Sequence, residues 1–451
     1  MLDRIAKALF VLGLAALVVL AGVVVGWYRL PPAPQIDASV DALQDWRTNW
    51  RSYLGLEPVK FLRKARYPGE GVVVFEPERA QPGVTLMTGL WGSLPGLSLR
   101  ALDGKELHRW PVRFSEIWPD ASHLPSDEVP FNDIDTHVHG ALLFPNGDVV
   151  FNFEYRGLVR LDRCGNVVWR LPRRTHHSVT IDEHGDLWVP SVKAEHEAPS
   201  DRFPRLRPPF SEDSILQVSA TDGKVLREIS LLDVLYGSSY EGALFPNAER
   251  YVHLTAADPL HLNHVEPLPS AIAAAFPLFE AGDLLVSMRE INLLLVIDPK
   301  TEKVKWAKTG PWVRQHEPHF LPNGRIAVFD NRQIENPPDR AATGKPPFAS
   351  RLLTVDPSSG RVTVVYEGTL EHPFYTDIMG KQQHLPNGNI LVTESTAGRA
   401  FEITPEGRTV WSFVNRFDAD RVALVEQATR YPESYAAFAA EACPAAGQGE
   451  S

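Results

Sequence analysis

The stretch that decides the fold runs from Gly140 to Trp169 and reads GALLFPNGDVVFNFEYRGLVRLDRCGNVVW. It holds an apolar strand, a Pro-Asn-Gly turn, a second strand, a glycine-containing turn, and strand residues that end in tryptophan. Proline presets the φ angle of such a turn, and asparagine and glycine tolerate positive φ. The stretch therefore predicts a unit of about four short strands.

Similar units recur along the chain. They lie at Ser178–Leu231, Gly282–Trp306, Phe320–Gly368 and His384–Trp411, with a weaker sixth unit at Gly83–Trp110. A four-stranded unit that repeats every ~40–60 residues is typical of a β-propeller. We therefore predict an all-β, six-bladed β-propeller over residues 71–415 with peripheral helices. A large β-sandwich is the alternative architecture.

Three insertions interrupt the repeat. His196–Asp213 and Gln333–Ala349 are rich in proline and arginine and are expected to form long surface loops. Pro267–Phe279 is a stretch of small apolar residues that predicts a short helix.

The first thirty residues predict a membrane anchor. Ala8–Trp27 is uncharged, almost wholly apolar and long enough to span a bilayer. Arg4 and Lys7 precede this run, and Trp27-Tyr28-Arg29 follows it as an interfacial belt. Its length favours an uncleaved transmembrane helix over the alternative, a cleaved signal peptide. The basic flank places the chain after Leu30 outside the cytoplasm.

Two further segments flank the propeller. Residues 31–70 form a helical linker region, because Pro31–Pro34 give a stiff exit and Ala38–Arg66 has apolar residues at helical spacing. This helix is expected to pack on the propeller, and the alternative is a helix on the membrane surface. Residues 416–451 predict a helix over Asp420–Ala440 and then a loose tail.

The composition is that of a globular protein and excludes several classes. Among 451 residues, 45 Lys and Arg stand against 56 Asp and Glu, a formal charge of −11. This acidic balance excludes a strongly basic nucleic-acid binder. Two cysteines, Cys164 and Cys443, exclude a disulfide-rich scaffold and a four-cysteine zinc site. At most one bridge is possible, and the sequence leaves open whether it forms.

Most of the histidines occupy one position in each repeat, just before or on the first strand. They are His137 and His139, His176 and His177, His261 and His264, His316 and His319, and His384. The first strand of each propeller blade lines the central channel, so equivalent positions in several blades converge in space. A single histidine is more often structural, but five repeats with the same placement favour a site at one mouth of the channel.

Such a ring of imidazoles is compatible with several chemistries. Imidazoles act as metal ligands, general acids or bases, and nucleophiles. His137 and His139 point the same way on a strand, which is a weak indication of a metal site. Arg289 and Arg156, one strand in from the channel, add charge that suits a tetrahedral oxyanion such as sulfate or phosphate. A Gly-x-Ser-x-Gly elbow and a phosphate-binding Gly-Lys-Ser/Thr loop are both absent from the sequence.

One family resemblance brings these features together. The stretch WVRQHEPHFLPNGRIAVFDN, Trp312–Asn331, followed by SRLLTVDPSSGRV, resembles the core of the bacterial arylsulfate sulfotransferases, six-bladed propellers of the cell envelope. Three further segments resemble the same family: DPLHLN from Asp258, SMREINLLLVIDPKTEKVKW from Ser287, and STAGRAFEI from Ser395. The resemblance covers roughly Asp135–Asn415.

The resemblance implies ping-pong transfer of a sulfuryl group from an aryl sulfate to a phenolic acceptor. The family's nucleophile falls on His316, with His261 and Arg289 around the sulfuryl group and His177, or His139 as a fallback, as a further histidine. Other residues are expected to contact the substrate: His137, His139, His176, His264, His319, His384 and Asn331. No metal, cofactor or nucleic acid is expected. The expected location is the bacterial inner membrane, single-pass, with the propeller in the periplasm.

The chain also departs from that family. Characterised members carry a separate β-rich domain before the propeller and are usually soluble after signal cleavage. His264, His319 and Glu317 are unusual beside the nucleophile, which indicates a diverged member. Two other functions stay open: a non-catalytic scaffold or binding module of the envelope, and a metal-dependent hydrolase or lyase that uses the histidine ring. The sequence does not indicate the physiological substrates or the oligomeric state.

Overall fold

The first of two compact units is helical. The computed structural model describes residues 2–28, 30–126, 128–245, 258–333 and 349–443. The two units are Met1–Lys60 and Phe61–Ser451. The first unit contains α1 (Leu2–Trp27) and α2 (Ala33–Tyr53), and η1 (Val59–Phe61) follows. Within α1, Arg4–Trp27 is apolar and long enough to cross a membrane, a test that a signal sequence also passes. The helix predicted over Ala38–Arg66 begins earlier and ends at Tyr53, just before Gly55 with φ +67°.

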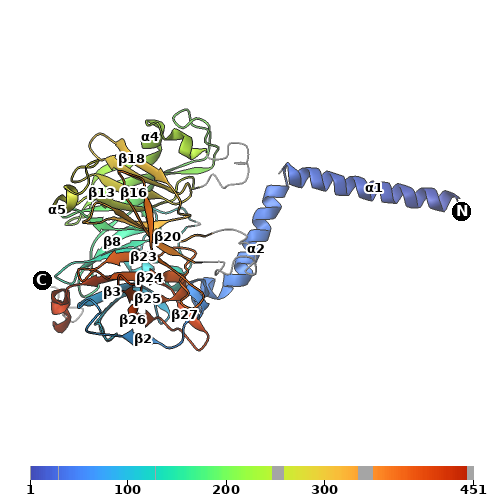
Figure 1. Cartoon of the computed structure of the whole chain (residues 1–451). Coiled ribbons are helices and arrows are strands. Elements are labelled where there is room, and N and C mark those ends of the chain that lie inside the picture. The colour runs from blue at the N-terminus through green and yellow to red at the C-terminus, as the bar shows by residue number, and fades with distance from the viewer. Residues whose placement is uncertain (1, 29, 127, 246–257, 334–348, 444–451) are drawn as a thin grey trace. The chain divides into compact units, whose positions relative to one another are not determined.

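The second unit is a six-bladed β-propeller, as predicted. In the part of the chain that the structure describes, six antiparallel sheets of four or five strands follow one another (Figure 1). Blades 1 to 3 contain β3 (Val84–Trp91), β4 (Leu94–Arg100) and β5 (Glu106–Pro111); β6 (Val138–Leu143), β7 (Val149–Phe153), β8 (Gly157–Leu161) and β9 (Val167–Leu171); and β10 (Arg174–Thr175), β11 (Thr180–Ile181), β12 (Asp186–His196), β13 (Phe210–Ser219) and β14 (Val225–Ser230).

Blades 4 to 6 have the same pattern. They contain β15 (Leu262–Pro267), β16 (Leu284–Met288), β17 (Leu293–Asp298) and β18 (Lys303–Thr309); β19 (His316–Phe320), β20 (Ile326–Asp330), β21 (Arg351–Val355) and β22 (Val362–Glu367); and β23 (Lys381–His384), β24 (Ile390–Glu394), β25 (Arg399–Ile403) and β26 (Thr409–Val414). The first strands meet around the axis, because β19 contacts both β15 and β23.

Both ends of the second unit close the ring. β2 (Gly71–Phe75) pairs with β26 at the outer edge of blade 6, and β28 (Val425–Tyr431) pairs with β3 as the first strand of blade 1. In Figure 1 the blue strand β2 lies beside the red strand β26. A short pair, β1 (Leu62–Lys64) with β27 (Arg421–Ala423), adds to this closure.

The helix predicted over Asp420–Ala440 is therefore wrong, and the propeller extends past residue 415 to Tyr431. The segment is rich in residues that favour helices, but its pairing with β3 outweighs that local preference. Only Glu433–Ala440, after Pro432, is helical, as the 3-10 helix η5.

The Pro-Asn-Gly turns have the predicted geometry. Gly147, Gly324 and Gly388 all have positive φ angles, between 75° and 90°. A Cβ atom at Gly147 would lie 2.5 Å from the ring of Phe438, and one at Gly324 would lie 2.4 Å from the carbonyl oxygen of Ala275. Glycine is therefore favoured at all three turns for its φ, and at Gly147 and Gly324 also for close packing.

The insertions are placed as follows. His196–Asp213 is only partly a loop, because β12 extends to His196 and β13 begins at Phe210. Most of Gln333–Ala349 lies outside the described residues. Pro267–Phe279 contains the short helix α5 (Ser270–Ala273), as predicted. Five other short helical elements complete the unit: α3 (Phe114–Ile117), η2 (Asp133–Asp135), α4 (Leu231–Tyr236), η3 (Glu241–Leu244) and η4 (Ser395–Ala397).

A disulfide ties the end of the described chain to blade 2. Cys164, in the turn between β8 and β9, is bonded to Cys443, which follows η5, across 279 residues of sequence. Phe438 of η5 packs in the same core cluster as Trp110 and Leu143. The segment after the closing strand is therefore held both by a covalent bond and by apolar packing.

We expect loss of this disulfide to lower stability. Cys164→Ser removes a cross-link that restricts the unfolded chain, a loss of about 2–4 kcal/mol. Thermal unfolding of the full-length protein in detergent should show a lower midpoint for Cys164→Ser, and reductant should lower the wild-type midpoint similarly. The double variant Cys164→Ser/Cys443→Ser is the control, because reductant should not affect it. A wild-type midpoint that is insensitive to reductant would contradict the expectation.

Candidate active site

The predicted histidines lie on or beside the first strands of blades 2 to 6. His137 and His139 flank or lie in β6, and His176 and His177 lie between β10 and β11. His261 immediately precedes β15, which contains His264, while β19 contains His316 and His319 and β23 contains His384. The first strands of neighbouring blades contact one another around the axis, so residues on them come close together. The fold thus brings residues from five repeats to one region.

His177 is the centre of one group. Its ring centroid lies 4.5 Å from that of His139, 4.8 Å from that of His261 and 6.4 Å from that of His316. Its backbone is left-handed, with φ +54°, and so is that of His261, with φ +51°. Strained backbone of this kind is often found at functional sites. Burial first, and the neighbouring imidazoles next, lower the pKa of His177 well below its ordinary value.

A series of hydrogen bonds passes through this group. His177 Nε2 lies 3.2 Å from His261 Nε2, and His177 Nδ1 lies 2.8 Å from His176 Nδ1. At one end, His261 Nδ1 is hydrogen-bonded to the carboxylate of Asp258. At the other end, His176 Nε2 lies 3.8 Å from Asp213 Oδ1. His176 Nε2 has no hydrogen bond within the described residues, so the hydrogen-bonded series runs from His176 through His177 and His261 to Asp258 and can pass a proton along that path.

The two carboxyl groups near its ends differ in pKa. Burial first, and the charge of Asp258 next, raise the pKa of Asp213 well above its ordinary value. Burial opposes ionisation of Asp258 too, but the hydrogen bond from His261 outweighs it and lowers the pKa of Asp258. The two carboxyl groups therefore differ in basicity, with Asp258, which is hydrogen-bonded to His261, the more acidic of the two.

The tautomer of His316 is fixed by its surroundings. Its Nδ1 lies 2.7 Å from Asn331 Oδ1 and 3.1 Å from the carbonyl oxygen of Arg314. The amide of Asn331 cannot be turned round, because its Nδ2 donates to the carbonyl oxygens of Thr376 and Met379. Both partners of Nδ1 are acceptors, so Nδ1 carries the hydrogen and Nε2 carries the free lone pair.

The same imidazole is kept neutral. Burial first, and the positive charge of Arg289 next, lower the pKa of His316 well below its ordinary value. A neutral ring with an unprotonated Nε2 has the electronic form of a nucleophile. Asn331, which was predicted to contact substrate, is instead fully buried and holds the His316 ring from behind.

Hydrogen bonds hold both the backbone and the guanidinium group of Arg289 in the site. Its backbone N–H donates to the carbonyl oxygen of His261 at 3.1 Å, and its Nη2 donates to Glu290 Oε1 at 2.6 Å. Glu290 also pairs with Arg314, so one carboxylate orients two guanidinium groups. The Nε of Arg289 is buried and has no hydrogen-bond partner within the described residues. It is therefore a donor that remains available to an anion.

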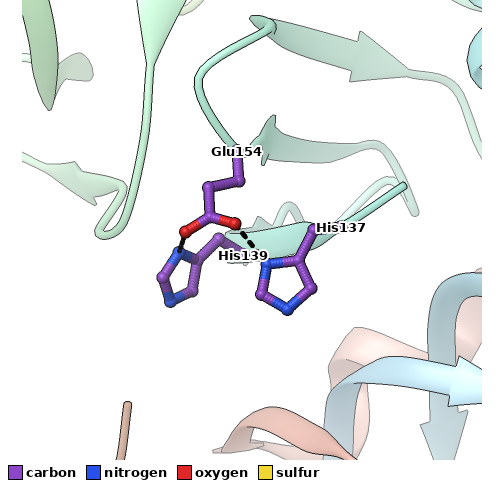
Figure 2. Close-up of side chains that lie close together, drawn as sticks. All are labelled: His137, His139 and Glu154. Carbon is purple, nitrogen blue, oxygen red and sulfur yellow. Dashed lines mark hydrogen bonds and ion pairs between the residues drawn. The ribbon is translucent and has the colours of Figure 1, made fainter. Parts of the chain in front are cut away.

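Glu154 connects two of the histidines (Figure 2). Its carboxylate lies between the rings, with Oε2 at 2.7 Å from His137 Nδ1 and Oε1 at 3.7 Å from His139 Nδ1. The opposite nitrogen of His137, Nε2, lies 2.9 Å from Glu426 Oε1 on β28. Burial disfavours charge on His137, but Glu426 and Glu154 outweigh it and raise its pKa to about 10. His137 is therefore a cation held between two carboxylates. It was predicted to contact substrate, but both of its ring nitrogens are already engaged by Glu154 and Glu426.

His139 has the opposite state. Burial lowers its pKa to about 3, against the effect of Glu154, so the ring is neutral. Its position beside His177 keeps it in the group around His316, whereas His137 supports the group from outside.

Tyr155 and Glu154 were missed by the sequence analysis. Tyr155 is half-buried and packs against His176, with ring centroids 4.5 Å apart, and its removal from water followed by the charge of Asp258 raises its pKa well above its ordinary value. One pattern would have found them. Glu154, Arg289 and Asn331 are each the first residue after the second strand of a blade, namely β7, β16 and β20. The turns after second strands thus form a second ring of site residues beside the histidines.

The remaining predicted residues form a second group. The rings of His264 and His319 pack at 5.2 Å, and Glu266, Glu317 and Lys381 lie beside them. Burial followed by His319 lowers the pKa of nearby His384 to about 4. Two sets of residues in the described chain have ligand atoms close enough for one metal ion: His137, His139 and Glu154, and His264, Glu266 and His319. A surface hollow lined by Glu183, Trp188 and Asp298, among others, contains none of the predicted site residues.

Comparisons with solved structures return propellers of low similarity. A Bacteroides caccae protein of unknown function is 12% identical over 77% of this chain and 98% of its own, with a TM-score of 0.47. The Kuenenia stuttgartiensis hydrazine synthase is 11% identical over 75% and 81%, with a TM-score of 0.42. A Staphylococcus aureus virginiamycin B lyase is 12% identical over 61% and 70%, with a TM-score of 0.36. At this level, none of them bears on the activity of this chain.

The comparison with protein families is more informative. No curated protein matches the chain. A family model described as arylsulfotransferase (ASST) matches residues 140–416, which begin within the first strand of blade 2, run through blade 6 and include every histidine of the site except His137 and His139. This agrees with the resemblance on which the sequence analysis rested. The chain therefore belongs to the arylsulfotransferase family.

Proposed function

We propose that this protein transfers a sulfuryl group from an aryl sulfate to a phenolic acceptor through a sulfohistidine on His316. The observation that carries the proposal is the state of His316: a neutral imidazole whose Nδ1 hydrogen is held by Asn331, which leaves the Nε2 lone pair free. Membership of the family supports the same reaction.

In the first half-reaction, His316 Nε2 attacks the sulfur of the aryl sulfate. The N–S bond forms as the bond between sulfur and the aryl oxygen breaks, and the bonding electrons leave on the phenolate. The developing negative charge on the sulfuryl oxygens is stabilised by Arg289, whose buried Nε has a free N–H. The phenolate takes a proton from the imidazole series of His177 and His261.

The second half-reaction reverses these steps with a different phenol. The acceptor hydroxyl gives its proton to the same imidazole series, and its oxygen attacks the sulfur. The N–S bond breaks and returns its electrons to His316 Nε2. The proton borrowed in the first half-reaction is restored, so the imidazole series and Asp258 end as they began. Because the sulfuryl group stays bound to the protein between the two steps, the kinetics are ping-pong.

The same proposal places the propeller outside the cytoplasm. Arg4 and Lys7 precede the apolar helix α1, which favours a cytoplasmic N-terminus and a single-pass orientation across the inner membrane. The disulfide between Cys164 and Cys443 supports this, because disulfides persist in the periplasm and are rare in the cytosol.

We expect His316→Ala to abolish transfer. The full-length protein in detergent is given 4-nitrophenyl sulfate and phenol, and nitrophenolate is followed by its absorbance. The variant should lose at least ~10³-fold in kcat because no other nucleophile replaces Nε2. His184→Ala, at an exposed turn, is the matched control and should retain full activity. Without acceptor, mass spectrometry should find one sulfuryl group on His316 in the wild type. Transfer that persists in His316→Ala would contradict the proposal.

We expect the acidic side of the pH profile to depend on Asn331. In the wild type, kcat/KM should stay constant as pH falls through the ordinary histidine pKa of about 6.5, because His316 remains neutral there. Asn331→Asp adds an anion next to Nδ1, raises the pKa of His316 and moves the loss of activity to higher pH. Asn331→Leu should instead lower kcat at every pH, because the tautomer is no longer held. Identical profiles for the wild type and Asn331→Asp would show that Asn331 does not act through His316.

A further inference from the structure

The second histidine group lies on the first strands of blades 4 and 5. His264 and Glu266 alternate along β15, so they point to the same face, and His319 lies on the adjacent strand β19. Glu317, also on β19, is paired with Lys381 of β23 at 2.6 Å. None of these residues takes part in the reaction proposed for His316, so the group calls for a separate explanation.

His264 is the unusual member of this group. Its side chain is fully buried, and neither ring nitrogen has a hydrogen-bond partner within the described residues. A buried polar group without a partner costs roughly 1–3 kcal/mol. Its Nδ1 faces the carboxylate of Glu317 at 3.4 Å, and its ring packs edge-on against that of His319. A buried imidazole with open nitrogens, aimed at carboxylates and a second imidazole, indicates a ligand between them.

The spacing of the donor atoms fits a metal ion. Two ligands at about 2.1 Å from a tetrahedral ion lie about 3.4 Å apart. The distance from His264 Nδ1 to Glu317 Oε2 is 3.4 Å, and that from His319 Nδ1 to Glu266 Oε1 is 3.2 Å. One ligand atom each of His264, Glu266 and His319 lie within 4.8 Å of one another. Small rotations of the side chains would bring all three to a common ion.

We propose that His264, His319 and Glu266 bind one divalent transition-metal ion between blades 4 and 5, with the Glu317 carboxylate beside it. Two imidazoles and one carboxylate are a ligand set typical of Zn²⁺, and they leave a fourth position for Glu317 or water. This site goes beyond the sulfuryl transfer assigned to His316 and supplies no step of it. The ion joins β15 to β19, the strand that begins with His316, and so stiffens the wall of the active site.

The other set of close ligand atoms is a weaker metal site. In the set of His137, His139 and Glu154, both nitrogens of His137 are already hydrogen-bonded to carboxylates, at 2.7 and 2.9 Å. A metal there would have to displace those bonds. In the His264 set, a metal would replace one hydrogen bond, that between His319 Nδ1 and Glu266 Oε1, and would satisfy His264, whose ring has no hydrogen bond within the described residues.

A network of ion pairs without metal is the competing explanation. A protonated His319 between Glu266 and Glu317, together with Lys381, would balance the charges of the group. That arrangement still leaves His264 Nε2 without a partner within the described residues and His264 Nδ1 without a hydrogen bond, 3.4 Å from Glu317 Oε2. The two explanations therefore differ in whether His264 is needed to hold an ion.

The test measures metal in the full-length protein, purified in detergent without a polyhistidine tag. After incubation with Zn²⁺ and removal of excess ion, elemental analysis should find about one Zn²⁺ per chain in the wild type. His264→Ala and His319→Ala should each lose it, and His139→Ala, from the other set, should keep it. Protein refilled with Co²⁺ should show the strong visible absorption of a tetrahedral site, and zinc should raise the unfolding midpoint of the wild type but not of His264→Ala.

Several results would overturn the metal site. They are a wild type that retains no zinc, zinc that survives both His264→Ala and His319→Ala, and zinc lost from His139→Ala instead. If His264→Ala does not fold, the Co²⁺ spectrum of the wild type decides, since a spectrum of six-coordinate aqueous cobalt would exclude the site. All of these readouts are independent of sulfuryl transfer, so a failure of the metal site is distinguishable from a failure of the function proposed for His316.

Discussion

The pairing of β28 with β3 is the constraint on which the rest of the structure depends. A propeller brings its first strands around one axis only if the ring is closed, and here the closing strand comes from residues 425–431. The same strand carries Glu426, which holds the His137 cation from the side opposite Glu154. Closure of the fold and support of the site therefore depend on the same strand. β2 and the disulfide to Cys164 strengthen the closure at two other points.

Burial sets the chemistry of the site, and nearby charges then distinguish one histidine from another. Removal of water disfavours the imidazolium form, so His139, His177 and His316 are neutral. His137 is equally buried but lies between two carboxylates, so it is charged. Four equally buried histidines thus take two protonation states, three neutral and one charged. A neutral imidazole beside a fixed guanidinium suits the proposed transfer of an anionic sulfuryl group.

The repeat pattern predicted more of the fold than of the site. The Pro-Asn-Gly turns and alternating strands were sufficient for the blades, because turn geometry and side-chain alternation are local properties. The segment over Asp420–Ala440 was misassigned as a helix, because its helix-favouring residues form a strand only through pairing with β3, far away in the sequence. The placement of the histidines was predicted correctly, since each lies at the same point of its repeat. Glu154 and Tyr155 were missed, because the turns after the second strands were not compared with one another.

By itself, the sequence determined the blade repeat, the apolar N-terminal helix and the convergence of histidines from five repeats. All three features follow from local patterns, in which the residues that matter lie within a few positions of one another in the sequence. Only the tertiary structure decided which nitrogen of His316 carries the hydrogen, because that depends on Asn331 and on carbonyl groups that orient its amide. It also decided that His137 is charged and that His264 lacks a partner. Protonation and hydrogen bonding depend on burial and on atoms from distant strands, which no local pattern in the sequence specifies.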